Sequence, residues 1–128
     1  REEDRAKIAR VFYNRLEQGM QLQSDATVAY ANNVTGRVST TAAERKLKSP
    51  YNTYYVKGLP IGPIASPSKA SMDAALHPAD GDWLYFVVVN LDTGETEFNA
   101  DKAGHDASVA KWRAWCAASD ANTKKCFG

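Results

Sequence analysis

Several patterns that identify common classes of protein are absent from these 128 residues. Neither GxGxxG nor GxxxxGK followed by Ser or Thr occurs, and GxSxG is missing. The chain therefore shows no glycine-rich phosphate loop and no nucleophile elbow of a serine hydrolase. No stretch approaches the roughly 20 apolar residues that a membrane span needs, and no signal-peptide pattern is present. The chain opens on REEDRAKIARVFYNRL without a methionine, so we expect a piece of a longer protein.

An excess of either charge is also missing. Lys and Arg total 16, Asp and Glu total 15, and the net charge is +1, so nucleic acid is not an expected partner. His77 and His105 lie far apart, and without a CxxC or Cys/His cluster no metal site is expected. Cys116 and Cys126 are close enough in sequence for a disulfide, which would indicate an oxidising compartment, but two unrelated thiols are equally compatible.

The apolar pattern predicts a compact α+β fold in a single domain over residues 1–128. Ile8, Val11, Phe12 and Leu16 form the stripe of an amphipathic helix. The segment DWLYFVVVN, the turn LDTGE and TEFN predict a β-hairpin. The expected helices cover 3–18, a segment after a cap at Asp25, a segment from a Thr41/Glu44 capping box that ends before Pro50, a segment from Ser66–Pro67 to near Pro78, and 105–119; the expected strands cover 20–23, 82–90 and 96–99.

The segment YNTYYVKGLPIGPIASPS, residues 51–68, combines three prolines, two glycines and three tyrosines with no acidic residue. Prolines this dense exclude a helix and a central strand. Leu59, Ile61 and Ile64 are more apolar than an idle linker requires. We therefore predict a stiff loop whose residues 51–64 line a binding cleft, with apolar anchors and uncharged polar tips.

Two short polar clusters are candidate binding sites. Gln23, Ser24 and Asp25 stand at the start of a helix, where free backbone N–H groups collect. The alternative is that Asp25 only caps that helix. The segment YNTY, residues 51–54, offers two phenols, an amide and a hydroxyl, which suit a polyhydroxylated ligand; the alternative is a surface strand with packed tyrosines.

Four segments together resemble the endolytic murein transglycosylase (YceG-like) family. They are VFYNRLEQGMQLQSDATVAY, SPYNTYYVKGLPIGPIASPS, ALHPADGDWLYFVV and EFNADKAGHDASV, and they span most of residues 11–109. The resemblance implies a fragment of the family's catalytic domain. It also implies a peptidoglycan lytic transglycosylase, which cuts the β-1,4 bond after N-acetylmuramic acid without water and leaves a 1,6-anhydro ring. One carboxylic acid performs this chemistry, and no metal or cofactor is implied.

By the same resemblance, the family's reacting glutamate lies upstream of Arg1, so it is not expected within these residues. Glu2 and Glu3 are nearby, but solvated charges at a helix entry explain them. The substrate-binding residues that the resemblance implies are Gln23, Asp25, Thr27, Tyr51, Asn52, Thr53 and Tyr54. The expected partners are peptidoglycan glycan strands and cell-wall synthases. The expected location is the extracytoplasmic face of the bacterial membrane, through an anchor in the missing N-terminal part.

Two further classes of function remain as alternatives. A non-catalytic glycan-binding module is compatible with a fragment that lacks the acid. A pyridoxal-phosphate enzyme is the other, because members of the family have carried an aminodeoxychorismate lyase label. That chemistry needs a Schiff-base lysine and a phosphate cup, and the sequence shows no glycine-rich cup.

Overall fold

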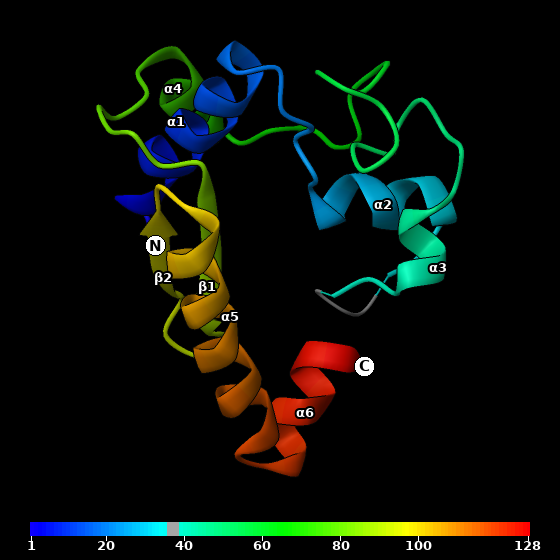
Figure 1. Ribbon diagram of the computed structural model, residues 1–128, viewed down its shortest axis with the longest axis vertical. Coiled ribbons are helices and arrows are strands. Elements are labelled where there is room, and N and C mark those ends of the chain that lie inside the picture. Colours follow the sequence, from blue (N-terminus) through cyan, green and yellow to red (C-terminus); the bar gives the residue numbers. More distant parts are fainter. Residues whose placement is uncertain (36–38) are drawn as a thin grey trace.

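The computed structural model describes residues 1–35 and 39–128 and shows the predicted α+β fold (Figure 1). Within these residues, six helices accompany a two-stranded antiparallel sheet. No helix among them has the length and apolarity needed to cross a bilayer. The elements are α1 (Asp4–Glu17), α2 (Asp25–Asn32), α3 (Ala42–Arg45), α4 (Lys69–Leu76), β1 (Tyr85–Asn90), β2 (Glu95–Asn99), α5 (Lys102–Ala117) and α6 (Asp120–Phe127).

Local signals placed several elements correctly. The stripe of α1 buries Val11, which is 1% exposed. The capping box of α3 is present: Thr41 Oγ1 accepts from the Glu44 amide, and Glu44 accepts from the Thr41 amide. The turn at 91–94 joins β1 to β2 as a hairpin. These features depend on neighbouring residues only, so the sequence alone was sufficient to predict them.

Other element boundaries were predicted wrongly. The N-cap of α2 is Ser24, and Asp25 is the first helical residue. Helix α4 begins two residues later than predicted because Ser68 caps it by accepting from the Ser71 amide at 3.1 Å. Helix α5 begins three residues earlier than predicted because Asp101 accepts from the Gly104 amide at 2.7 Å. Each helix is thus capped by a Ser or Asp close to the predicted start, and the boundary shifts by one to three residues.

The strand predicted over residues 20–23 does not form. The Met20 amide donates to the Arg15 carbonyl at 2.9 Å, which closes the end of α1. The Arg15 guanidinium also donates a hydrogen bond to the Gln21 carbonyl at 2.9 Å. A backbone carbonyl that would pair with a neighbouring strand is therefore already bound by a side chain. Residues 20–23 consequently form no strand in spite of their alternating pattern.

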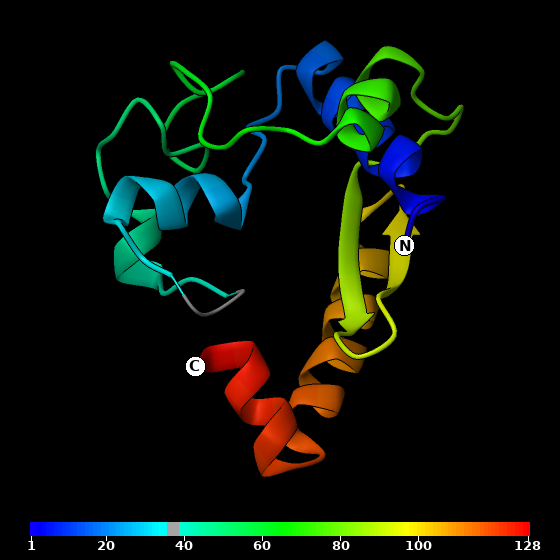
Figure 2. The same ribbon diagram turned by 180° about the vertical axis from the view of Figure 1, so that it is seen from behind.

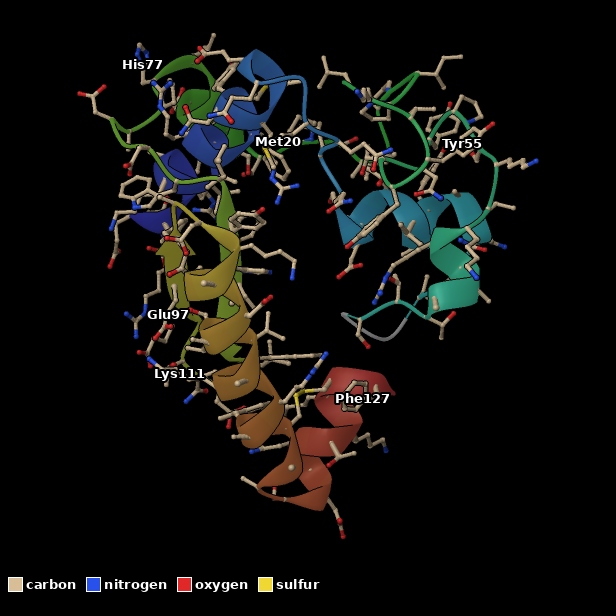
Figure 3. The ribbon with its side chains drawn as sticks, in the orientation of Figure 1. Met20, Tyr55, His77, Glu97, Lys111 and Phe127 are labelled. Carbon is tan, nitrogen blue, oxygen red and sulfur yellow. A yellow bond between two sulfur atoms is a disulfide. The ribbon has the colours of Figure 1, made fainter. Side chains whose placement is uncertain are left out.

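The two faces of the hairpin contact different helices. On one face, Phe86 meets Phe12 of α1 with ring centroids 5.9 Å apart. On the other face, Ser108 of α5 is 3% exposed and donates to Glu97 at 2.6 Å. Lys111 of α5 also meets Glu97, at 2.8 Å, and Figure 3 shows the two side chains pointing toward one another. Side chains alternate between the faces as β pleating requires.

Figures 1 and 2 show the elements arranged in two groups. Helices α1, α4 and α5 with the hairpin form one group, and α2, α3 and the loop before α4 form the other. The segment after α1 joins the groups at one end. At the other end, α6 reaches across, where Ser39 Oγ donates to the Cys126 carbonyl at 3.0 Å. Lys125 of α6 forms an ion pair with Asp92 in the hairpin turn.

Helix α6 was not predicted, because DANTKKCF has no clear apolar stripe. It begins at a Ser119 cap that accepts from the Asn122 amide at 3.0 Å. The disulfide Cys116–Cys126 then fixes it to α5, with both cysteines buried and their Cα atoms 6.1 Å apart. Of the two states that the sequence left open for these cysteines, the structure shows the disulfide.

Removing this disulfide should destabilise the protein measurably. Closing a loop with a sequence separation of 10 contributes about 2–3 kcal/mol in the chain-entropy model. We expect the variant Cys116→Ala/Cys126→Ala to lose about this much free energy of unfolding in urea titrations. A reductant should produce a similar loss in the parent protein and none in the variant. Two titratable thiols in the unreduced, unfolded parent would contradict the assignment.

Candidate functional site

A cavity of about 540 Å³ lies between the two groups of elements. Its walls come from α1, the segment before α2 and the start of α2, α3 with the segments on either side of it, β1 and α5. Val11, Phe86, Val88 and Val109 are among its apolar lining residues, and nine polar or charged side chains also line it. These nine are Arg15, Gln23, Ser24, Asp25, Ser39, Arg45, Tyr54, His105 and Arg113.

Gln23 enters the cavity wall from a strained backbone. Its φ is 51°, in the left-handed region that a residue with a side chain rarely adopts. The Thr53 backbone carbonyl holds it there by accepting from the Gln23 amide at 3.2 Å. The next amide, that of Ser24, donates to Thr53 Oγ1 at 2.9 Å. Backbone strain of this kind concentrates at binding sites, because the surrounding contacts must enforce it.

Thr27 and Thr53 lie behind the cavity wall and do not face into it. Their hydroxyls are 2.7 Å apart, and the residues are 5% and 0% exposed. Thr27 Oγ1 also donates to the Ser24 carbonyl at 2.7 Å. The pair therefore joins the loop to the start of α2 and fixes Gln23 between them. Both side chains are buried in this structure, so neither presents a surface for the direct contact with a sugar that was predicted.

Asn52 is likewise internal, with 0% exposure. Its Nδ2 donates to the Arg45 carbonyl at 2.9 Å and to the Leu47 carbonyl at 2.8 Å. Its Oδ1 accepts from the Tyr54 amide at 2.9 Å. The two bonds from Nδ2 hold the loop against the end of α3, and the bond from the Tyr54 amide fixes the turn within the loop. Asn52 therefore shapes the loop. The prediction that Asn52 contacts a ligand would need an exposed side chain, and the structure buries this one completely.

The two tyrosines of YNTY have different surroundings. Tyr51 packs on Tyr30 of α2 with ring centroids 5.0 Å apart, and it is not among the described residues that line the cavity. Tyr54 does line it, with the Arg45 guanidinium 5.6 Å from the ring centroid. Burial raises the pKa of the Tyr54 phenol, and the Asp25 carboxylate raises it further. The phenol therefore keeps its proton and acts as a hydrogen-bond donor toward Asp25.

Of the predicted cleft residues 51–64, Tyr54 alone is among the described residues at the cavity. Leu59 and Ile61 are 72% and 71% exposed, so they are not the buried anchors that their apolarity suggested. The loop has no helix or strand, as its prolines predicted. It supports one cavity residue from behind and leaves its apolar tip on the surface.

Asp25 belongs to a polar chain on the opposite wall from the hairpin. Thr40 Oγ1 donates to Asp25 Oδ1 at 2.6 Å. Arg45 Nε donates to the same hydroxyl at 2.9 Å and lies 4.0 Å from Asp25 Oδ1. The carboxylate is thus oriented by α3 and the segment before it, although Asp25 itself starts α2.

Arg15 and His105 are cavity residues that the sequence reasoning missed. Arg15 is 7% exposed, donates through Nε to the Leu84 carbonyl at 2.6 Å, and lies 4.9 Å from the Tyr85 ring. Burial lowers the pKa of Arg15. His105 stacks on Tyr85 with centroids 4.9 Å apart, and burial lowers its pKa, which favours neutral imidazole. Both lie in segments of the family resemblance, which is the signal that could have found them.

Comparison with known proteins decides the family. The sequence model of the YceG-like family matches residues 1–111. The chain belongs to the YceG-like family. The match contains every cavity residue named above except Arg113, and it ends before the disulfide and α6.

Relatives in this family are close in sequence and in structure. A protein of Bacillus subtilis named endolytic murein transglycosylase is 43% identical over 111 residues, which are 85% of this chain and 29% of that protein. One of the same name from Streptococcus pneumoniae is 36% identical over 113 residues, 85% of this chain and 20% of that protein. A YceG-like crystal structure from Listeria monocytogenes has a TM-score of 0.73 and 45% identity, covering 78% of this chain and 32% of that one. The chain thus spans between a fifth and a third of the length of these relatives.

Proposed function

We propose that this chain is part of a peptidoglycan lytic transglycosylase and that its central cavity holds the glycan strand. The observation that carries the proposal is the meeting of Gln23, Asp25 and Tyr54 at one cavity. They come from two segments of the family match that are far apart in sequence. The names of the family relatives support murein as the substrate.

The proposed reaction breaks the bond between N-acetylmuramic acid and the following N-acetylglucosamine. One carboxylic acid gives its proton to the leaving oxygen, and the resulting carboxylate helps the 6-hydroxyl of the muramic acid close onto C1. The 1,6-anhydro ring forms without water, so the second carboxylate of an ordinary glycosidase has no task here. The acid in this proposal is the family's glutamate, which precedes the segment that matches α1.

The cavity residues have binding roles in this proposal. Asp25 already accepts from Thr40, so its remaining lone pairs can accept from a sugar hydroxyl. Tyr54 keeps its phenolic proton and can donate it. Gln23 offers an amide that both donates and accepts, as an acetamido group requires.

The other two classes of function make different demands on the cavity. A pyridoxal-phosphate enzyme needs a lysine, and the described residues that line this cavity include none. A glycan-binding module needs only the cavity, and we expect residues 1–128 by themselves to behave in this way. The proposed location is outside the cytoplasm, on the membrane face that meets peptidoglycan. We propose that an anchor in the N-terminal part of the longer protein holds it there. Cell-wall synthases are the proposed protein partners.

Replacing Gln23 with glycine should separate binding from folding. Glycine adopts a φ of 51° without strain, and this gain of about 1 kcal/mol is offset by the greater freedom of glycine in the unfolded chain. The melting temperature should therefore change little. Loss of the amide should weaken binding of a purified glycan strand by about 2- to 10-fold, the value of one or two neutral hydrogen bonds.

Calorimetric titration with strands of defined length measures the affinity, and differential scanning calorimetry measures the melting temperature. Gln18→Ala is the matched control, because Gln18 lies at the exposed end of α1 and is outside the cavity lining. It should leave both values unchanged. Unaltered affinity in Gln23→Gly would remove Gln23 from the proposed site.

A further inference from the structure

Three of the side chains at the central cavity are arginines, which outnumber its one carboxylate among the described lining residues. Arg15, Arg45 and Arg113 line it, and Asp25 is the carboxylate among the described lining residues. Arg45 lies 4.0 Å from that carboxylate, so one cation and one anion offset each other. Two guanidinium charges therefore remain without an offsetting carboxylate: that of Arg15 on α1 and that of Arg113 on α5.

The two remaining arginines are bound differently. Arg15 gives its Nε and one terminal nitrogen to backbone carbonyls and has no acidic partner in the described part of the chain. Arg113 is exposed and makes no hydrogen bond or ion pair with any residue of 1–35 or 39–128. A guanidinium that is free on the edge of an apolar-walled cavity can accept an anion without first breaking a protein contact.

A neutral amino-sugar chain does not require such a charge. Carboxylates are the anionic groups of peptidoglycan strands: the lactyl group of muramic acid where no peptide is attached, and the stem peptides elsewhere. The planar fork of arginine matches a carboxylate in a bidentate hydrogen bond. Both α5 and α1 project arginine to the cavity, so a carboxylate beside the bound sugars would meet positive potential on that side.

We propose that Arg113 is a specificity-determining residue that selects strands carrying carboxylates on their muramic acid units. The inference rests on the proposed function, since it assumes that glycan enters this cavity. It adds a residue that lies beyond the family match, which ends at 111. The position of Arg113 near the disulfide end of α5, where α6 is fixed, keeps its backbone in place.

Binding of the 128-residue protein to four ligands of equal sugar number tests the proposal. They are strands with intact stem peptides, strands whose stems have been removed to leave free lactyl carboxylates, the latter strands after methylamidation of those carboxylates, and chitin oligosaccharides. Both carboxylate-bearing strands should bind more tightly than the two neutral ligands. Comparison of the first two strands shows whether the lactyl or the stem carboxylate is selected.

The variants Arg113→Gln and Arg113→Lys identify the residue responsible. Arg113→Gln should weaken binding of the carboxylate-bearing strands by about 3- to 10-fold and leave the affinity for chitin oligosaccharides unchanged. Arg113→Lys should restore part of the preference. Lys124→Gln, which removes an exposed charge from α6 outside the cavity lining, is the control and should alter neither affinity. All four proteins should share one melting temperature.

Two results would overturn the inference, and they are distinguishable. Equal binding of all four ligands by the parent protein would show that the cavity binds glycan but does not select carboxylates. A preference that persists undiminished in Arg113→Gln would assign the selection to another residue. Failure of every ligand to bind would instead remove the proposed function itself.

Discussion

Purified peptidoglycan should yield fragments that end in a 1,6-anhydro ring when it is treated with a protein that joins residues 1–128 to the family's glutamate-bearing segment. Residues 1–128 by themselves should yield none. General acid catalysis contributes on the order of 10²- to 10⁴-fold to such a reaction, so the difference should exceed about 100-fold. Mass spectrometry of the released muropeptides measures it, because anhydro ends lack one water relative to hydrolysed ends.

The acidic residues of the described chain explain why no activity is expected from it. Glu2 and Glu3 are exposed, and Glu2 pairs with Arg5 at 2.8 Å. Neither is among the described residues at the cavity. Asp25 is at the cavity, but Thr40 and Arg45 already orient its carboxylate as an acceptor.

Two variants of the joined protein act as controls for this prediction. Changing the preceding glutamate to glutamine should abolish anhydro products, whereas Asp25→Asn should slow their formation and leave their chemical identity the same. Equal activity of the glutamine variant would contradict the single-acid mechanism. Anhydro products from residues 1–128 alone would place the acid within them.

The fold was predictable where the signal is local. The apolar stripe of α1, the turn of the hairpin and the capping box at Thr41 each depend on residues within about one or two helical turns. The false strand at 20–23 shows the limit. Its alternating pattern was correct as a pattern, but the Arg15 side chain had already bound the carbonyls that a strand needs. No window of sequence reveals such a competition.

The sequence reasoning selected segments that reach the central cavity, but it did not predict which of their side chains face it. QSDAT and YNTY were named as separate candidate segments, and the structure brings them together through Thr27 and Thr53. Which of their side chains face outward could not be read from the sequence. An uncharged polar residue has the same composition whether it binds a ligand or satisfies buried backbone groups, and the partners of Asn52 lie in a turn of the chain that only the fold defines.

Asn52→Ala should accordingly destabilise the protein strongly, although the family resemblance implied a substrate-binding role for Asn52. The Arg45 and Leu47 carbonyls and the Tyr54 amide would lose their partner at a position with 0% exposure. Unsatisfied buried groups cost about 1–3 kcal/mol each, and entry of water offsets part of this, so we expect a loss of about 3 kcal/mol. For a domain of this size the melting temperature should fall by roughly 10 °C.

A graded control separates this effect from the general sensitivity of the protein to asparagine replacement. Asn122 donates one side-chain hydrogen bond, to the Trp115 carbonyl at 2.9 Å, so Asn122→Ala should lose only about 1 kcal/mol. Glycan affinity should be measured well below both melting temperatures. In Asn52→Ala the Tyr54 amide loses its partner, so the affinity should fall only by the amount that a displaced Tyr54 side chain causes. A melting temperature within about 2 °C of that of the unmutated protein, together with a large loss of glycan affinity, would contradict this prediction. It would assign Asn52 to ligand binding, which requires the loop to open.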